Sequence, residues 1–189
     1  MINFHTAEFI KSASKKEDHL HDLPEILLIG KSNVGKSSLI NALTNQKSLA
    51  YVSKTPGQTK LVNYYKIDNK LYLVDVPGFG YRRLAYEKDD FEPLMENYFS
   101  SNTSLKAVLY LLDSRRDITQ DELDVMEYIN NLQYPLVIVF TKSDKCKQKE
   151  KSKLLKTIKE LNITNFNFVS ISNNRLLENL KSTITSYIE

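Results

Sequence analysis

The chain has 189 residues and a mass of 21.8 kDa, with 41% hydrophobic and 26% charged residues, which suits one globular domain over residues 1–189 and excludes a second large one. A formal net charge of +3 is compatible with nucleic acid but does not require it. The single cysteine, Cys146, excludes an internal disulfide, and no signal peptide or membrane-spanning apolar run is found, so we expect a cytoplasmic protein without stable membrane insertion.

The N-terminal segment, residues 1–24, is expected to form an arm or leading strand followed by a loop, ahead of a core at 25–189. A short apolar patch, Phe4 to Ile10, opens it, and a polar stretch with His19 and His21 follows. Because no cysteine or third histidine lies nearby, we interpret these two as surface histidines and assign them no metal.

A phosphate-binding motif is predicted between the apolar run Glu25 to Ile29 and the helix-prone segment Ser38 to Leu43. There the chain reads Gly-Lys-Ser-Asn-Val-Gly-Lys-Ser over residues 30–37, which we call the cradle. A strand, a tight turn and a helix start bring unpaired backbone N–H groups and the positive end of the helix dipole to one point, which favours an anion.

Individual cradle residues have distinct predicted roles. Gly30 and Gly35 supply backbone conformations that a side chain would obstruct. Lys36 is placed to reach the β- and γ-phosphates of a nucleotide, and the Ser37 hydroxyl is placed to bind Mg²⁺. The motif therefore predicts a nucleoside triphosphate site.

A polar stretch, Lys47 to Lys60, carries Pro56-Gly57 and is long enough to move. Two strand-like segments follow, Leu61 to Ile67 and Lys70 to Asp75, and the Asp68-Asn69 pair between them is typical of a tight hairpin. One antiparallel pair is therefore expected in an otherwise parallel sheet.

The rest of the chain alternates between helix and strand. In order, we predict a helix at Asp89 to Phe99, a strand at Ala107 to Leu112, a helix at Asp121 to Leu132, a strand at Leu136 to Phe140, a helix at Gln148 to Leu161, a strand at Phe166 to Val169 and a helix at Arg175 to Ile188. This alternation predicts a three-layer α/β fold: a mostly parallel six-stranded sheet with one antiparallel strand, and helices on both faces. Ligands bind outside the carboxyl ends of such strands.

The motif Asp75-Val76-Pro77-Gly78 follows the predicted hairpin. Asp75 can hold a water on Mg²⁺, and the Gly78 amide, with no side chain in the way, can contact a γ-phosphate. This motif therefore belongs at the triphosphate end of the site.

A second motif, Thr141-Lys142-Ser143-Asp144, follows the strand Leu136 to Phe140. A carboxylate at Asp144 can accept hydrogen bonds from N1–H and the exocyclic amine of guanine, while the Lys142 stem can lie over the base. Adenine lacks that pair of donors, so the motif favours guanine nucleotides.

Two further segments are weaker candidates. Ser170-Ile171-Ser172 follows the last predicted strand, and its backbone could touch O6 of guanine. In the polar stretch, Thr59 could supply its hydroxyl to Mg²⁺ when a γ-phosphate is present, with Thr55 as the competing candidate. We favour Thr59 because it adjoins the strand that would anchor it.

With these motifs the chain resembles the EngB family of ribosome-biogenesis GTP-binding proteins, within the class that includes Era and MnmE. The resemblance covers nearly the whole chain and is carried by Asp22-Leu23-Pro24-Glu25, the block Gly30 to Asn45, Ser53 to Thr59, and Asp75 to Tyr81. It implies a Ras-like G domain of the P-loop NTPase fold that uses Mg²⁺ and GTP or GDP. It also implies a role in assembly of the large ribosomal subunit and in normal cell division and septation.

The resemblance also implies site residues, position by position. Ser37 and Thr59 would be magnesium ligands, with Asp75 beside them at the metal. Nucleotide contacts would come from Gly30, Lys31, Ser32, Asn33, Val34, Gly35, Lys36, Ser37 and Ser38; from Gly57, Gln58, Thr59, Lys60 and Leu61; from Asp75, Val76, Pro77 and Gly78; from Thr141, Lys142, Ser143 and Asp144; and from Ser170, Ile171 and Ser172. Two features depart from other GTPases: Thr141 replaces a frequent asparagine, and Ser170 to Ser172 match only loosely.

The expected catalysis is slow. Phe79 stands where Ras-like enzymes have a glutamine that orients water, so we expect unassisted hydrolysis on the order of 10⁻⁴ s⁻¹ or below. Lys36, Thr59 and Gly78 would neutralise and position the phosphates. Asn33 would hold a potassium ion, as in several relatives, or else only stabilise the loop.

The expected partner is the large ribosomal subunit or its precursor, including rRNA, bound by a monomer. Arginines and lysines could form a basic surface for rRNA, or the lysines could be a solvated helix face: Arg82, Arg83, Arg115, Arg116, Lys145, Lys147, Lys149, Lys151 and Lys153. The alternatives are a division-associated GTP-binding interaction protein with no direct ribosome role, and a metabolic P-loop kinase, in which residues 141–144 would have no purpose.

Overall fold

The computed structural model describes residues 1–51, 61–78, 88–100 and 102–189. The strands are β1 (Glu8–Ala13), β2 (Glu25–Gly30), β3 (Val62–Ile67), β4 (Leu71–Asp75), β5 (Leu105–Asp113), β6 (Leu136–Thr141) and β7 (Phe166–Phe168). The α-helices are α1 (Lys36–Thr44), α2 (Lys88–Phe99), α3 (Gln120–Asn131), α4 (Gln148–Glu160) and α5 (Asn174–Ser186). Short 3₁₀ helices lie at Phe4–Thr6, Lys16–Asp18 and Ser143–Lys145.

The described strands form one seven-stranded sheet in the order β1-β3-β4-β2-β5-β6-β7. Strand β3 is antiparallel to both of its neighbours, and the remaining pairs are parallel. The sheet has one strand more than the six expected, because residues 8–13 of the N-terminal segment pair with β3. The α/β class and the single antiparallel strand, β3, are confirmed, but there are two antiparallel pairs rather than the one expected, because β1 also pairs with β3.

The β3–β4 hairpin is confirmed, and its turn explains why it is tight. Three residues, 68–70, lie between the paired Ile67 and Leu71, and Asp68 and Asn69 both have φ of +51°, the left-handed backbone that a tight hairpin turn needs. Lys70 N–H donates to the Ile67 carbonyl at 2.9 Å and closes the loop. Asp and Asn tolerate this conformation better than most residues that carry a side chain.

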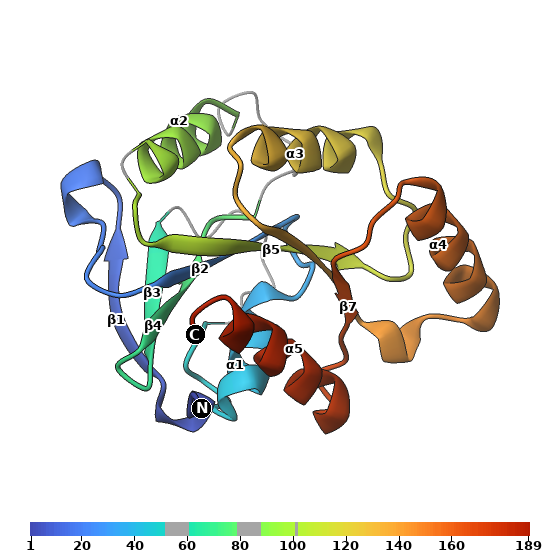
Figure 1. Ribbon diagram of the computed structural model, residues 1–189, viewed down its shortest axis with the longest axis horizontal. Coiled ribbons are helices and arrows are strands. Elements are labelled where there is room, and N and C mark those ends of the chain that lie inside the picture. Colours follow the sequence, from blue (N-terminus) through green and yellow to red (C-terminus); the bar gives the residue numbers. More distant parts are fainter. Residues whose placement is uncertain (52–60, 79–87, 101) are drawn as a thin grey trace.

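Helices cover both faces of the sheet (Figure 1). On one face, α1 and α5 bury side chains such as Leu39, Leu43 and Leu180 against one set of strand residues. On the other, α2, α3 and α4 contribute residues such as Tyr98 and Ile129 to a second core with the alternate strand residues. Two-sided burial explains why β2 is buried along its whole length.

The parallel strands β2, β4, β5, β6 and β7 all end at the same edge of the sheet. The cradle, Asp75 to Gly78, the segment after β5, Thr141 to Asp144, and Ser170 to Ser172 all follow these ends in the chain. Within the described ranges, none of the helices has the length and apolar character needed to cross a membrane.

Candidate functional site

The cradle joins the end of β2 to the start of α1. Gly35 caps the helix with φ of +115°, a conformation that strains any residue with a Cβ atom. Asn33 also has positive φ, at +63°. The turn therefore takes the left-handed backbone that the sequence predicted at Gly35, directly before the unsatisfied N–H groups of α1.

Lys36 and Asp75 influence each other at the centre of the site. Burial lowers the pKa of the Lys36 ammonium group, and the nearby Asp75 carboxylate opposes that shift. Asp75 is 4% exposed, and burial raises its pKa to about 6 although Lys36 pulls it down. The Lys36 charge is poorly solvated, so its electrostatic attraction for a phosphate would be stronger than that of an exposed lysine.

The donor set at Asp75 fits a hard cation. Its Oδ1 atom is buried and has no hydrogen-bond partner among the described residues. A carboxylate oxygen and the Ser37 hydroxyl are oxygen donors of the kind that Mg²⁺ prefers. The described residues hold no cluster of three or more His, Cys, Asp or Glu side chains, so any metal here would depend on hydroxyl, water and phosphate oxygens.

Gly78 lies directly against the cradle. The Ser32 hydroxyl donates to the Gly78 carbonyl at 3.2 Å. A Cβ atom added to Gly78 would stand 2.8 Å from both the backbone N and the Cα of Ser32, a clash with main chain that cannot swing away. The loop after β4 and the cradle are therefore in van der Waals contact in this structure.

Thr141 bonds the guanine motif to the cradle. Its hydroxyl donates to the Val34 carbonyl at 2.8 Å, with the Leu112 carbonyl 3.2 Å away. Thr141 is buried at the end of β6. A threonine in place of the frequent asparagine thus still supplies a donor to the cradle backbone.

Lys142 also reaches the cradle. Its ammonium group donates to the Asn33 carbonyl at 2.9 Å and to the Asp113 carboxylate at 3.1 Å, and its backbone has φ of +57°. The aliphatic stem is therefore extended from β6 toward the phosphate end. Asp144 is exposed in the short helix that follows, where a base could approach it.

The segment Ser170 to Ser172 lies beside the guanine motif. Ser143 N–H donates to the Val169 carbonyl at 3.1 Å, which ties the two strand-end loops together. The hydroxyls of Ser170 and Ser172 are 2.9 Å apart, and Ile171 between them is 58% exposed. The segment therefore adjoins the guanine motif, and its contact with the base stays a prediction.

Several predicted site residues lie outside the described residues: Gly57, Gln58, Thr59 and Lys60, the competing Thr55, and Phe79, Arg82 and Arg83 in the second gap. Leu61 is described and partly exposed just before β3. Val76 is buried and Pro77 partly buried.

The structure reveals contacts that the sequence did not indicate. Lys31 donates to the Thr119 hydroxyl at 2.9 Å and pairs with Glu122 at 3.3 Å, so the cradle is fixed to the start of α3. Thr119 and Glu122 form a capping box, which is recognisable as Thr-x-x-Glu in sequence, but the link to Lys31 is not.

Arg115 was grouped with Arg116 as a candidate RNA-binding residue, and the structure separates the two. Arg115 binds Asp113 through two side-chain hydrogen bonds of 2.9 and 2.7 Å. Arg116 is exposed and forms no ion pair with the described residues. On α4, Lys153 pairs with Asp117 at 2.6 Å.

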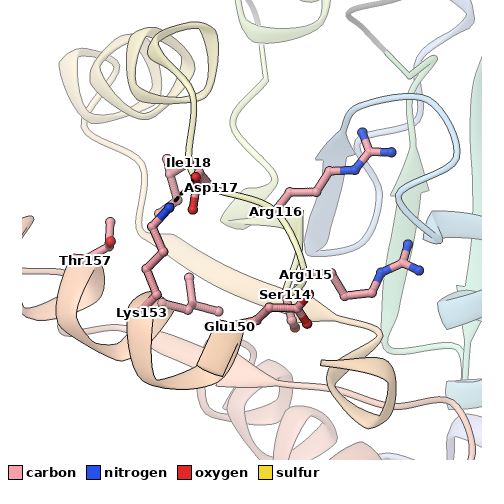
Figure 2. A pocket seen from close by; sticks show the side chains of 9 residues that line it. Ser114, Arg115, Arg116, Asp117, Ile118, Glu150, Lys153 and Thr157 are labelled. Carbon is pink, nitrogen blue, oxygen red and sulfur yellow. Dashed lines mark hydrogen bonds and ion pairs between the residues drawn. The ribbon is translucent and has the colours of Figure 1, made fainter. Parts of the chain in front are cut away.

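A cavity of about 210 Å³ lies beside these arginines, between the β5–α3 loop and α4 (Figure 2). Ser114, Asp117 and Ile118 contribute to its wall from the loop, and Lys153 and Thr157 from the helix. In Figure 2 the Arg115 and Arg116 side chains extend away from the Lys153–Asp117 pair.

Comparison with known proteins places residues 25–142 in a family described as 50S ribosome-binding GTPase. The chain is 46% identical to "Probable GTP-binding protein EngB" of Clostridium beijerinckii, covering 82% of this chain and 79% of the relative. It is 41% identical to the protein of the same name in Solibacter usitatus, covering 88% of each.

Solved structures show the same fold. A "probable GTP-binding protein engB" superposes with a TM-score of 0.64 at 24% identity, covering 87% of this chain and 98% of that one. Era in complex with MgGDPNP and nucleotides of 16S ribosomal RNA superposes with a TM-score of 0.68 at 22% identity, covering 90% and 58%.

Proposed function

The chain belongs to the EngB family of GTP-binding proteins and is a GTPase, and from this premise we propose that it is a nucleotide-dependent switch in assembly of the large ribosomal subunit. In this proposal GTP orders the loops around Thr59 and Gly78, and the ordered surface engages a ribosomal precursor. The proposal includes a role in normal cell division and septation.

One observation carries the switch: Gly78 rests on Ser32 of the cradle. The Gly78 amide is the group expected to meet a γ-phosphate, so its loop adjoins the place where that phosphate would bind. GTP and GDP differ only in this phosphate. A loop packed on the cradle would sense that difference directly, because it must adjust to the phosphate or bond with it.

The residues divide the work of phosphoryl transfer. The cradle amides and Lys36 bind the phosphates, and Asp144 and Lys142 orient the guanine end. Ser37, Thr59 and a water on Asp75 would hold Mg²⁺, which when bound would neutralise charge on the phosphate oxygens. These residues hold substrate in place, but Phe79 supplies no group that could orient water.

Hydrolysis is therefore slow until a partner completes the site, on the order of 10⁻⁴ s⁻¹ or below for the isolated protein. A potassium ion held by Asn33, which is exposed in the cradle, would assist the reaction further. Turnover of wild type and Asn33→Ala in potassium and in sodium tests this role. Equal rates in both cations would exclude it.

We further propose that the chain acts as a cytoplasmic monomer with one G domain over residues 1–189. The family description and the rRNA complex of the Era neighbour support rRNA within a large-subunit precursor as the partner. A basic surface that binds an RNA backbone loses affinity steeply with salt, so flat salt dependence of the association would indicate protein contacts instead.

Two experiments test the switch. Gradient sedimentation with ribosomal subunits should show co-migration in a nonhydrolysable GTP analogue and its loss in GDP. Depletion of the protein should accumulate large-subunit precursors in subunit profiles. If neither occurs while division still fails, the alternative of a division-associated interaction protein without a ribosome role replaces this proposal. Tighter binding of ATP than of GTP would contradict the guanine assignment.

A further inference from the structure

Asp113, the last residue of β5, is held in one orientation by its neighbour two residues on. The Arg115 guanidinium donates from Nε to Oδ1 at 2.9 Å and from Nη2 to Oδ2 at 2.7 Å. The backbone N–H of Arg115 donates to Oδ1 at 3.1 Å. Together with Lys142 these donors hold the pKa of the Asp113 carboxyl well below its usual range, although burial acts the other way. The carboxylate is therefore charged and fixed.

The fixed carboxylate faces the lysine of the guanine motif. The Lys142 ammonium group lies 3.1 Å from Asp113 Oδ2 and 2.9 Å from the Asn33 carbonyl. One anion and one backbone carbonyl thus define the end of the Lys142 side chain. A long, flexible lysine without such contacts would lose this single extended shape, because it has many rotamers of similar energy.

We propose that Arg115 is a positioning residue for guanine nucleotides, acting through Asp113 on Lys142. The Arg115 guanidinium fixes the Asp113 carboxylate, and that carboxylate holds the Lys142 ammonium group at the Asn33 carbonyl of the cradle. The lysine stem, which is expected to lie over the base, would thereby be fixed at its far end. The bidentate geometry requires arginine, because lysine cannot form two parallel bonds to one carboxylate.

The burial of its partner supports this role for Arg115. The Arg115 side chain is 37% exposed, but the side chain of Asp113 is only 9% exposed, so solvent screens this pair less than it screens two exposed side chains. In Figure 2 the Arg115 side chain extends away from Lys153 and Asp117, which pair with each other. Arg115 therefore takes no part in the Lys153–Asp117 pair and binds Asp113 instead.

The test is nucleotide affinity in a double-mutant cycle. Arg115→Ala should weaken GTP and GDP binding by the same factor, roughly 5- to 20-fold, because both ligands share the base and the cradle phosphates. In a Lys142→Met background the same substitution should change affinity less than about twofold, since its effect passes through the lysine. Arg115→Lys should restore only part of the loss.

Arg116→Ala is the matched control, because it removes the same charge from the adjacent residue but breaks no ion pair with the described residues; it should leave nucleotide affinity unchanged. Thermal unfolding of each nucleotide-free variant checks folding. The proposal is overturned if Arg115→Ala binds like wild type, if its loss persists with Lys142→Met, or if Arg116→Ala loses as much.

This inference rests on the placement of Lys142 at the nucleotide, and the same titrations keep the two claims apart. If the wild-type protein does not prefer GTP over ATP, the proposed function is contradicted. If the wild-type protein binds GTP normally and Arg115→Ala binds it with the same affinity, only the role of Arg115 is contradicted.

Discussion

The Thr141 hydroxyl donates to the Val34 carbonyl at 2.8 Å, joining residues 107 positions apart. Thr141→Val keeps the shape and removes the donor, which leaves a buried carbonyl without its bond. We expect the free energy of unfolding to fall by about 1–3 kcal/mol and nucleotide affinity to fall with it. Chemical denaturation and GTP titration measure both. Thr141→Ser, which keeps the hydroxyl, should lose much less; equal losses in the two variants would contradict the assigned bond.

Gly78→Ala tests the contact between the β4 loop and the cradle. The new Cβ would stand 2.8 Å from the Ser32 backbone, so the loop must move off the cradle. We expect GTP affinity to fall about tenfold or more relative to GDP, because only GTP uses the Gly78 amide. Comparison of the two dissociation constants checks this. Ser32→Gly in addition should not rescue the loss, since the clash is with main-chain atoms; recovery would show that the Ser32 side chain is the obstacle.

Asp144→Ala tests base recognition. The carboxylate is exposed at the end of the guanine motif and is expected to accept two hydrogen bonds from guanine. Its removal should weaken GTP binding by roughly 10²- to 10⁴-fold and leave weak ATP binding unchanged, so that the preference between them disappears. Competition titration with both nucleotides measures the ratio. A variant that keeps its preference for GTP would place the base elsewhere.

His19 predicts a pH effect on stability. It is half-buried, not the surface histidine expected from the sequence; its Nδ1 atom lies 2.9 Å from the Tyr64 hydroxyl, and its buried Nε2 atom has no hydrogen-bond partner among the described residues. Burial, with help from His21, lowers the pKa of His19 below 6.5. The folded state therefore binds fewer protons than the unfolded state as pH falls below 6.5. The contribution of neutral His19 to the free energy of unfolding is fully present above pH 6.5 and is lost as pH falls below it.

His19→Gln keeps a polar atom for Tyr64 and cannot take up the proton. Its free energy of unfolding should decline less than that of wild type between about pH 7 and pH 5. The buried Glu25, whose pKa burial raises, titrates in both proteins and cancels from the difference. Denaturation curves at several pH values measure it, and parallel pH profiles would show that His19 is not the group responsible.

The sequence predicted most of the fold because each element has a local signal. The Asp68-Asn69 pair between two strand-like segments predicted the hairpin. The amphipathic run that begins at Gln148 predicted α4, with bounds within one residue of those observed. The seventh strand was left open as an arm or strand. Its residues, with exposed Phe9, form an edge strand whose pairing with β3 depends on residues 49 to 58 positions away.

The candidate site was predictable as a set of loops but not as a network. The predicted strand ends indicated which motifs share one edge of the sheet, and the motifs that the structure describes lie at that edge. Contacts such as Lys31 to Thr119 span 88 residues and leave no periodic or compositional mark. The bond from Arg115 to Asp113 was also missed, because it is set by the local turn after β5, whereas two adjacent arginines favour an RNA surface by composition; that surface stays a prediction. The roles of Thr59 and its neighbours stay predictions.

The cross-bonds around the cradle also bear on protein engineering. Ser32, Asn33, Val34 and Lys31 are each bonded to a different part of the chain, at Gly78, Lys142, Thr141 and Thr119. Grafting residues 30–37 onto a foreign strand–helix unit would transfer the backbone amides without the hydrogen-bonded partners that orient them. Such a graft should bind phosphate weakly until equivalent partners are built around it.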